Sequence, residues 1–280
     1  MQLRKIWAVL AAMLFLASAA LAADDRLVSF SVHGKPVAQW SFADIEKHLP
    51  ATRITVWEPH ENKNVTYEGF DIGKLFAAVY GAQWKDQDEV LFTCVDGYQP
   101  VLSMDRFNRH QGLLAYRRLD QDAFTVNNRF QDEKNVPLGP FYLVWDNLQS
   151  KELRDDGGNG WPYQVVGVDL VTFADRFPRL SPPKDASETA KRGFLAFREN
   201  CMSCHTVNGE GGNKAPELNY PMSVTEYLSD AWLRKWLMDP RSIRYNSAMP
   251  DFASHPEPDV LVDEVLAYLK TMAKHKQMPQ

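Results

Sequence analysis

The 280-residue sequence contains only three cysteines, too few for the several disulfides that stabilise a small secreted scaffold. It also lacks an excess of positive charge, because 31 lysines and arginines face 36 aspartates and glutamates. This balance argues against nucleic acid as a partner, since phosphate binding needs clustered basic residues. An apolar share of 45% and the chain length predict about two globular domains with real hydrophobic cores.

Long apolar runs are missing after the first two dozen residues, and the run at the start is typical of an export signal. In residues 1–22, Arg4 and Lys5 precede an apolar stretch that ends in the small-residue sequence A-L-A at 20–22. The alternative is an uncleaved membrane anchor, because 18 uncharged residues are just long enough to span a bilayer. Cleavage removes both basic residues and predicts a periplasmic protein of net charge −7 with no membrane span.

Two zones of different composition follow the predicted signal. Residues 24–178 alternate short β-rich runs with short helical ones, which indicates an α+β domain with mixed strand pairing. Residues 179–187, with the sequence RLSPPKDAS, are expected to form a linker. Residues 188–280 are helical in pattern, with glycine and proline in the loops. The predicted fold class is therefore α+β, a mixed β-rich N-terminal domain followed by an all-α domain.

The most specific motif is C-x-x-C-H, formed by Cys201, Cys204 and His205. Two thiols at this spacing can add to the two vinyl groups along one edge of a haem, and the adjacent imidazole can then bind the iron. A thioredoxin-like redox pair would need a βαβ setting, and a zinc site would need a second Cys/His pair. Neither pattern is evident, so we expect one covalently bound haem c.

Around this motif, residues 187–276 resemble a class I cytochrome c domain. Gly193 and Phe197 lie one turn apart in a segment similar to the first helix of that family. The resemblance implies that Gly193 allows a close crossing with the last helix, here residues 259–273. It also implies that Tyr268 is an aromatic contact at this crossing.

The axial ligands of the iron are expected on both sides of the ring. Residues 211–216 resemble the loop in which a proline carbonyl, here that of Pro216, accepts the N–H of the axial histidine; an imidazole ligand needs such a partner to fix its orientation. Met249 lies in the sequence S-A-M-P, 44 residues after His205. A methionine in a loop beside proline is poorly explained by core packing, and its placement resembles the distal methionine loop of the family.

Other residues are weaker candidates for the sixth ligand. His255 would give a bis-histidine site, Met222 follows a proline, Met238 is expected to pack within its helix, and Met202 lies between the haem-linking cysteines. A thioether ligand stabilises ferrous iron and raises the reduction potential. An iron with both axial positions filled transfers electrons and has no open position for bond chemistry.

The N-terminal half resembles a second family. Residues 64–75 look like the Y-x-G-hydrophobic-x-L entry of the oxidoreductase molybdopterin-binding domain, which has the sulfite oxidase-like fold. The turn at 96–98 and the G-P strand at 137–144 follow in the order of that family, and the resemblance covers residues 26–176. It implies a molybdenum–pterin centre held by one cysteine thiolate, and Cys94 is the cysteine available.

The sequence also departs from this family. The local pattern C-V-D-G-Y lacks the asparagine and arginine that often follow the metal ligand. No basic cluster for the pterin phosphate is evident, although Arg106, Arg109, Arg117 and Arg118 are possible substitutes. Cys94 is therefore expected to pack as a small buried residue, and molybdenum ligation is the alternative.

Two polar segments suggest metals at first sight. Residues 58–63 contain His60 between Glu58 and Glu61, but this run is expected to be a solvated turn. Residues 155–160, D-D-G-G-N-G, lack the spacing and terminal glutamate of a calcium-binding EF-hand loop and are expected to form a flexible loop.

Two functions remain open. The first is a periplasmic monohaem cytochrome that transfers single electrons to or from a dehydrogenase, another cytochrome or a terminal oxidase. Its N-terminal domain would lack the cofactor and serve in docking or ligand binding. The alternative is a molybdenum-dependent oxidoreductase, similar to sulfite dehydrogenases, that passes electrons to its fused haem. Fusion favours the enzyme, whereas the missing pterin-binding residues and the acidic balance favour the electron carrier.

Overall fold

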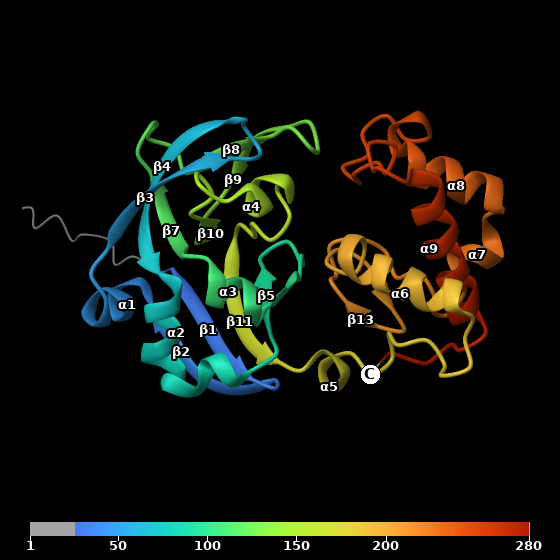
Figure 1. The fold of residues 1–280 in the computed structure, drawn as a ribbon, viewed down its shortest axis with the longest axis horizontal. Coiled ribbons are helices and arrows are strands. Elements are labelled where there is room, and N and C mark those ends of the chain that lie inside the picture. The colour runs from blue at the N-terminus through green and yellow to red at the C-terminus, as the bar shows by residue number, and fades with distance from the viewer. Residues whose placement is uncertain (1–25, 280) are drawn as a thin grey trace, which may run out of the picture.

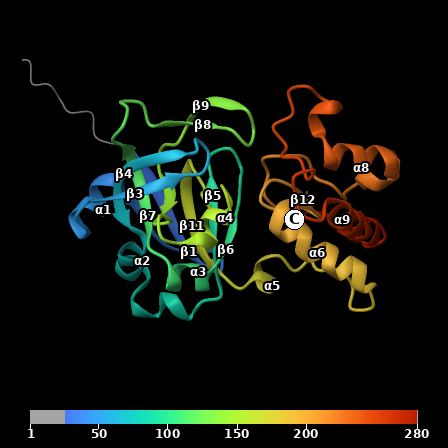
Figure 2. The same ribbon diagram turned by 45° about the horizontal axis from the view of Figure 1, so that its top comes forward.

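The structure, a computed structural model, describes residues 26–279. The predicted export signal at 1–22 lies outside the described residues. A strand-rich part and a helical part lie side by side, and the chain passes between them near α5 (Figures 1 and 2). This arrangement confirms the predicted α+β class. Within residues 26–279, no helix is both long and apolar enough to cross a membrane.

Two sheets form the strand-rich part. The first has five strands in the order β2 (Lys35–Ser41), β1 (Leu27–Val32), β11 (Val165–Val171), β5 (Glu89–Cys94) and β6 (Val101–Ser103). The second has four, in the order β10 (Tyr142–Trp145), β7 (Gly112–Arg118), β4 (Lys63–Asp71) and β3 (Thr52–Glu58). Strands β1 and β11 are parallel, whereas β11 and β5 are antiparallel. The pairing is therefore mixed, as the sequence predicts.

Short elements connect and cover these sheets. They are α1 (Phe42–His48), α2 (Ile72–Tyr80), the 3-10 helix η1 (Ala82–Asp86), α3 (Met104–Arg109), α4 (Lys151–Asp155) and α5 (Phe173–Arg176). Strands β8 (Thr125–Asn128) and β9 (Glu133–Pro137) form a separate hairpin, which extends toward the helical part in Figure 2.

Aromatic side chains fill the core of the strand-rich part. Phe92 and Phe107 stack with ring centroids 6.2 Å apart, and Phe107 meets Trp145 edge-on at 5.0 Å. All three are buried, and Trp145 donates its indole N–H to the carbonyl of Gly160 at 2.7 Å. This contact anchors the segment 155–160, which was expected to be a flexible loop, against the core.

The helical part contains α6 (Glu188–Asn200), α7 (Val224–Tyr227), α8 (Asp230–Met238), the 3-10 helix η2 (Pro240–Ser242) and α9 (Pro258–Ala273). A two-residue ladder joins β12 (Thr206–Val207) to β13 (Glu210–Gly211). Helix α6 crosses α9 at Gly193, where a Cβ atom would lie 1.8 Å from the carbonyl oxygen of Glu264. Phe197 packs on Tyr268 at 5.1 Å. The predicted close crossing and its aromatic contact are confirmed.

Candidate functional site

A cavity of about 870 Å³ opens between the helices of the C-terminal part. It lies within the usual range of cofactor pockets, about 300–1,000 Å³. Its apolar lining includes Phe197, Leu218, Leu228, Leu233, Trp236, Leu237, Val265 and Leu269. Cys201, His205, Pro216 and Met249 also line it. Cys201 and Met249, 48 positions apart, therefore converge on one large apolar cavity, and the donor atoms of Cys201, His205 and Met249 suit a covalently held haem.

The first side of the cavity is formed by the C-x-x-C-H turn. The amide nitrogens of Cys204 and His205 both donate to the carbonyl of Cys201, at 3.1 and 2.9 Å. Both cysteines are unpaired thiols, and burial raises the pKa of Cys201 to about 12. A Cβ at Gly212 would lie 1.9 Å from the carbonyl oxygen of Ser203, so the following loop lies directly against this turn.

The orientation of His205 is set by its second ring nitrogen. Nδ1 lies 2.8 Å from the carbonyl oxygen of Pro216, which can only accept, so Nδ1 carries the proton and Nε2 is free to bind a metal. Burial also lowers the pKa of His205, which favours the neutral imidazole that ligation requires. The arrangement matches the role that the resemblance implied for Pro216.

Met249 lines the same cavity. Among residues 26–279, Met249 is the only methionine that lines this cavity, and His205 is the only histidine. Met202 is buried but does not line the cavity, and Met222 is exposed. His255 lies in an exposed turn, where its Nδ1 accepts from the amide of Glu257. The geometry therefore favours Met249 over the alternatives.

The region around Cys94 has a different character. Cys94 is 3% exposed and belongs to the aromatic core. Burial, followed by the charge of Asp96, raises the pKa of its thiol, whereas a metal ligand must be a thiolate. Within the described chain, no group of three or more His, Cys, Asp or Glu residues could hold a metal ion.

The four arginines proposed for a pterin are engaged elsewhere. Arg106 pairs with Asp156, Arg109 with Glu152, Arg117 with Glu68, and Arg118 with Glu61 and Asp120. All four guanidinium groups therefore already have carboxylate partners, which, with the buried thiol of Cys94, argues against a fit to a molybdenum–pterin centre. The possible role of these arginines in binding a pterin stays a prediction.

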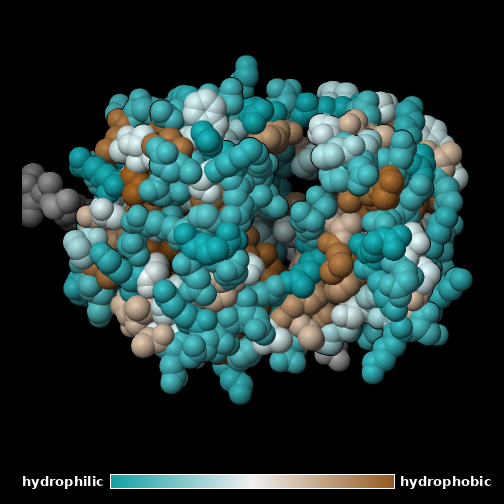
Figure 3. Space-filling view, viewed as in Figure 1, coloured by the Kyte–Doolittle hydropathy of each residue, from teal (hydrophilic) through white to brown (hydrophobic). Residues whose placement is uncertain are grey.

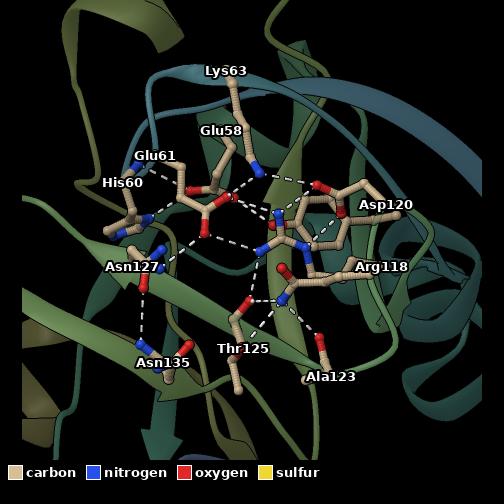
Figure 4. A network of polar contacts seen from close by, with 12 residues as sticks. Glu58, His60, Glu61, Lys63, Arg118, Asp120, Ala123, Thr125, Asn127 and Asn135 are labelled. Carbon is tan, nitrogen blue, oxygen red and sulfur yellow. Dashed lines mark hydrogen bonds and ion pairs between the residues drawn. The ribbon is translucent and has the colours of Figure 1, made fainter.

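A buried polar cluster occupies the segment that was expected to be a solvated turn (Figure 4). Glu58 is fully buried and His60 is 4% exposed. Glu58 accepts hydrogen bonds from the hydroxyls of Tyr67 at 2.7 Å and Tyr142 at 3.1 Å, and His60 Nδ1 lies 2.7 Å from the same carboxylate. The prediction of a solvated turn is wrong because these partners come from β4 and β10, and no local pattern reveals them.

Next to this cluster lies a buried ion network. The guanidinium of Arg118 is fully buried and contacts Glu61 at 2.8 Å and Asp120 at 2.7 Å, and Lys63 reaches Asp120 at 3.1 Å (Figure 4). Burial alone would raise the pKa of Glu61, but hydrogen bonds from Arg118 and the amide of Asn127 outweigh it and lower this pKa to about 2. The hydrogen bond from Arg118 lowers the pKa of Asp120 to about 2 as well.

The strand-rich part contacts the C-x-x-C-H turn directly. The amide of Gln99 donates to the carbonyl of Ser203 at 2.7 Å, and the amide of Asn213 donates to the carbonyl of Gly97 at 2.8 Å. An ion pair between Lys214 and Asp96, at 2.8 Å, lies beside them. Most of the surface seen in Figure 3 is hydrophilic, and its hydrophobic residues are scattered, some of them near the boundary between the two parts. Apart from the D-G turn at residues 96–97, no pattern in the sequence indicates these contacts.

Comparison with known proteins agrees with the site in the helical part. Residues 190–273 match the family model described as Cytochrome c. The cytochrome c oxidase subunit 2 of Alkalihalophilus pseudofirmus is 31% identical over 96 residues, which are 32% of this chain and 28% of that protein. This chain thus spans little more than a quarter of that relative. Residues 190–273 are a cytochrome c domain, of the class that binds haem and transfers electrons.

A solved structure also shows similarity. The sulfane dehydrogenase SoxCD from Paracoccus pantotrophus aligns with a TM-score of 0.36 and 14% sequence identity. The alignment covers 54% of this chain and 39% of that chain.

Proposed function

We propose that this chain is an exported cytochrome with a single haem c, which carries single electrons between periplasmic redox proteins. The observation that carries the proposal is the convergence of Cys201, His205 and Met249 on one apolar cavity of suitable size. Haem bound there supplies an iron that alternates between the ferrous and ferric states.

The residues of the chain have distinct roles in this proposal. Cys201 and Cys204 hold the haem through thioether bonds. His205 ligates the iron with Nε2, while its Nδ1–H donates to Pro216 and fixes the ring. Met249 would supply the second ligand of the iron. The apolar lining excludes water from the iron, which reduces the reorganisation that accompanies each electron transfer. With both axial positions filled, no position remains for a substrate.

The N-terminal domain is proposed to act without a cofactor of its own. The misfit around Cys94 supports this, because the thiol is buried and the nearby arginines are paired elsewhere. Its loop containing Gly97 and Gln99 lies on the C-x-x-C-H turn. We therefore assign this domain a docking role, and the first partner that it binds is the haem domain of the same chain. The similarity to a cytochrome c oxidase subunit 2 favours an electron chain that ends on an oxidase.

The test begins with the full-length chain, including residues 1–22, produced in a host that matures c-type cytochromes and synthesises molybdopterin. We expect a periplasmic protein that begins at Ala23 by mass spectrometry and contains one iron and no molybdenum per chain. A molybdenum-to-iron ratio near one would overturn the proposal in favour of a molybdenum oxidoreductase.

The sixth ligand is tested in the same preparation. Ferric haem with a thioether ligand shows a weak long-wavelength absorption band. We expect Met249→Ala to lose this band and to have a lower reduction potential. Met222→Ala, a methionine on the surface outside the cavity, is the matched control and should retain both. If the band survives in Met249→Ala, Met249 is not the ligand.

A further inference from the structure

The tip of the β8–β9 hairpin, in the N-terminal domain, reaches the loop that carries Met249. Gln131 donates from Nε2 to the carbonyl oxygen of Ala248 at 2.9 Å. Arg241, in η2, donates from Nη2 to the carbonyl of Gln131 at 2.6 Å and from Nε to the carbonyl of Ser247 at 3.3 Å. The two residues that precede Met249 are therefore both held through their carbonyl groups, one directly by the hairpin and one through Arg241.

The amide group of Gln131 is itself fixed in orientation. Its Oε1 accepts a hydrogen bond from Asn128 Nδ2 at 2.8 Å and lies 3.4 Å from the hydroxyl of Tyr163. Asn128 is buried, and its Oδ1 accepts from the amide of Phe130 at 3.1 Å. Because donors occupy the oxygen side of the Gln131 amide, the NH₂ side must face the Met249 loop. This is a preorganised contact, since the N-terminal domain has already fixed the side chain that makes it.

The loop that receives this contact is exposed before Ser247, whereas Met249 packs against the apolar core of the helical part and the amide of Phe252 donates to the carbonyl of Leu237 at 3.1 Å. Arg244, Tyr245 and Asn246 are exposed, Tyr245 to 89%. The amide of Met249 donates to Ser247 Oγ at 3.3 Å, a hydrogen bond within the loop itself. A thioether is also a neutral and weak electron-pair donor. The two held carbonyls therefore add hydrogen bonds from the N-terminal domain and from Arg241 to the packing that keeps Met249 at the cavity.

We propose that Gln131 and Arg241 are positioning residues for Met249, so that the N-terminal domain sets how firmly the sixth ligand is held. The inference rests on the proposed function, because it takes Met249 as that ligand. Through these two residues the hairpin limits how often the loop opens, and an external ligand can reach the iron only when it is open. The docking of the two domains and the ligation of the haem are coupled in this way.

Imidazole, titrated against the ferric holoprotein and followed by haem absorbance, measures this opening directly. We expect Gln131→Ala to bind imidazole roughly two- to tenfold more tightly, which corresponds to the loss of one hydrogen bond of about 0.5–1.5 kcal/mol. Arg241→Ala should act in the same direction. Gln111→Ala is the matched control, because it removes an amide that donates to Asp71 within the N-terminal domain, and we expect its imidazole affinity to be unchanged.

Three comparisons make the result decisive. If Gln131→Ala binds imidazole no more tightly than Gln111→Ala, the proposal is overturned. The positioning role also requires that Gln131→Ala does not destabilise the N-terminal domain itself. If the variant lowers the free energy of unfolding of that domain by as much as it changes the free energy of imidazole binding, the effect is general destabilisation and the positioning role is again overturned. If Met249→Ala itself binds imidazole no more tightly than the unmodified protein, the axial assignment has failed, which identifies the proposed function as the error.

Discussion

The crossing of α6 and α9 offers the sharpest test of how this domain is held together. Replacing Gly193 by alanine adds one methyl group at the point of closest approach. That Cβ would lie 1.8 Å from the carbonyl oxygen of Glu264 and 2.9 Å from Cβ of Tyr268, whereas ordinary van der Waals contact begins near 3.4 Å. The first obstacle is backbone and cannot rotate away, so the two helices must separate by more than one ångström.

The cost can be estimated from this geometry. Overpacking in a core costs about 1–3 kcal/mol, and a backbone obstacle belongs at the upper end of that range. Alanine recovers about 1 kcal/mol, because glycine is a poor residue inside a helix. The net loss is about 2 kcal/mol, which for a domain of this size lowers the melting temperature by about 8–16 °C. Separation also pulls Phe197 away from Tyr268 and widens the cavity that both helices line.

Thermal unfolding of the holoprotein, followed by haem absorbance for the cytochrome domain and by far-ultraviolet circular dichroism for the whole chain, measures this loss. Gly73→Ala in α2 is the matched control, since its Cβ would meet only Asp71 Oδ1 at 3.4 Å and Trp84 at 3.8 Å. There we expect a gain of about 0.4–1 kcal/mol. If Gly193→Ala melts at or above the temperature of the unmodified protein, the close crossing does not limit the stability of this domain.

Three further predictions concern the N-terminal domain. Arg118→Met leaves two carboxylates without their buried partner and should destabilise the domain by about 3–5 kcal/mol in urea unfolding; a loss below about 1 kcal/mol would show that the network is not needed. Because the pKa of Glu61 and that of Asp120 are both lowered to about 2, their contribution is complete above pH 4.5 and lost as pH falls toward 2. Near-ultraviolet circular dichroism against pH should show this loss in the unmodified protein and a flatter profile in Arg118→Met, and equal slopes would contradict it. Cys94 should react with iodoacetamide at pH 8 only after unfolding, because burial raises the pKa of its thiol, and rapid labelling of the native protein would contradict that burial.

The parts that sequence reasoning predicted well are those that depend on local order. The C-x-x-C-H motif lies within five consecutive residues, and its turn brings the cysteines and His205 together without help from distant segments. The helical character of the second half follows from periodic patterns within single helices. The role of Gly193 was implied by the resemblance of residues 187–276 to a class I cytochrome c domain, and the structure shows the close crossing. The mixed α+β class follows from the alternation of short elements along the first half.

The parts that were missed depend on contacts between distant segments. Glu58 and His60 look like surface residues in sequence, yet Tyr67 and Tyr142 from other strands provide the hydrogen bonds that allow their burial. Arg118 was considered for a phosphate and instead neutralises carboxylates inside the fold. Charge and turn composition alone cannot separate a solvated residue from one that finds a partner many residues away.

The junction at the C-x-x-C-H turn has a consequence for how this sequence can vary. Its hydrogen bonds join the backbone of Gln99 and Gly97 to that of Ser203 and Asn213, so these bonds do not depend on which side chains the four residues carry. Gly97 is the exception for two independent reasons: its φ is +86°, and a Cβ there would lie 2.9 Å from the backbone of Asn213. Substitution of Gln99, Ser203 or Asn213 should therefore be tolerated. Gly97 should tolerate no other residue.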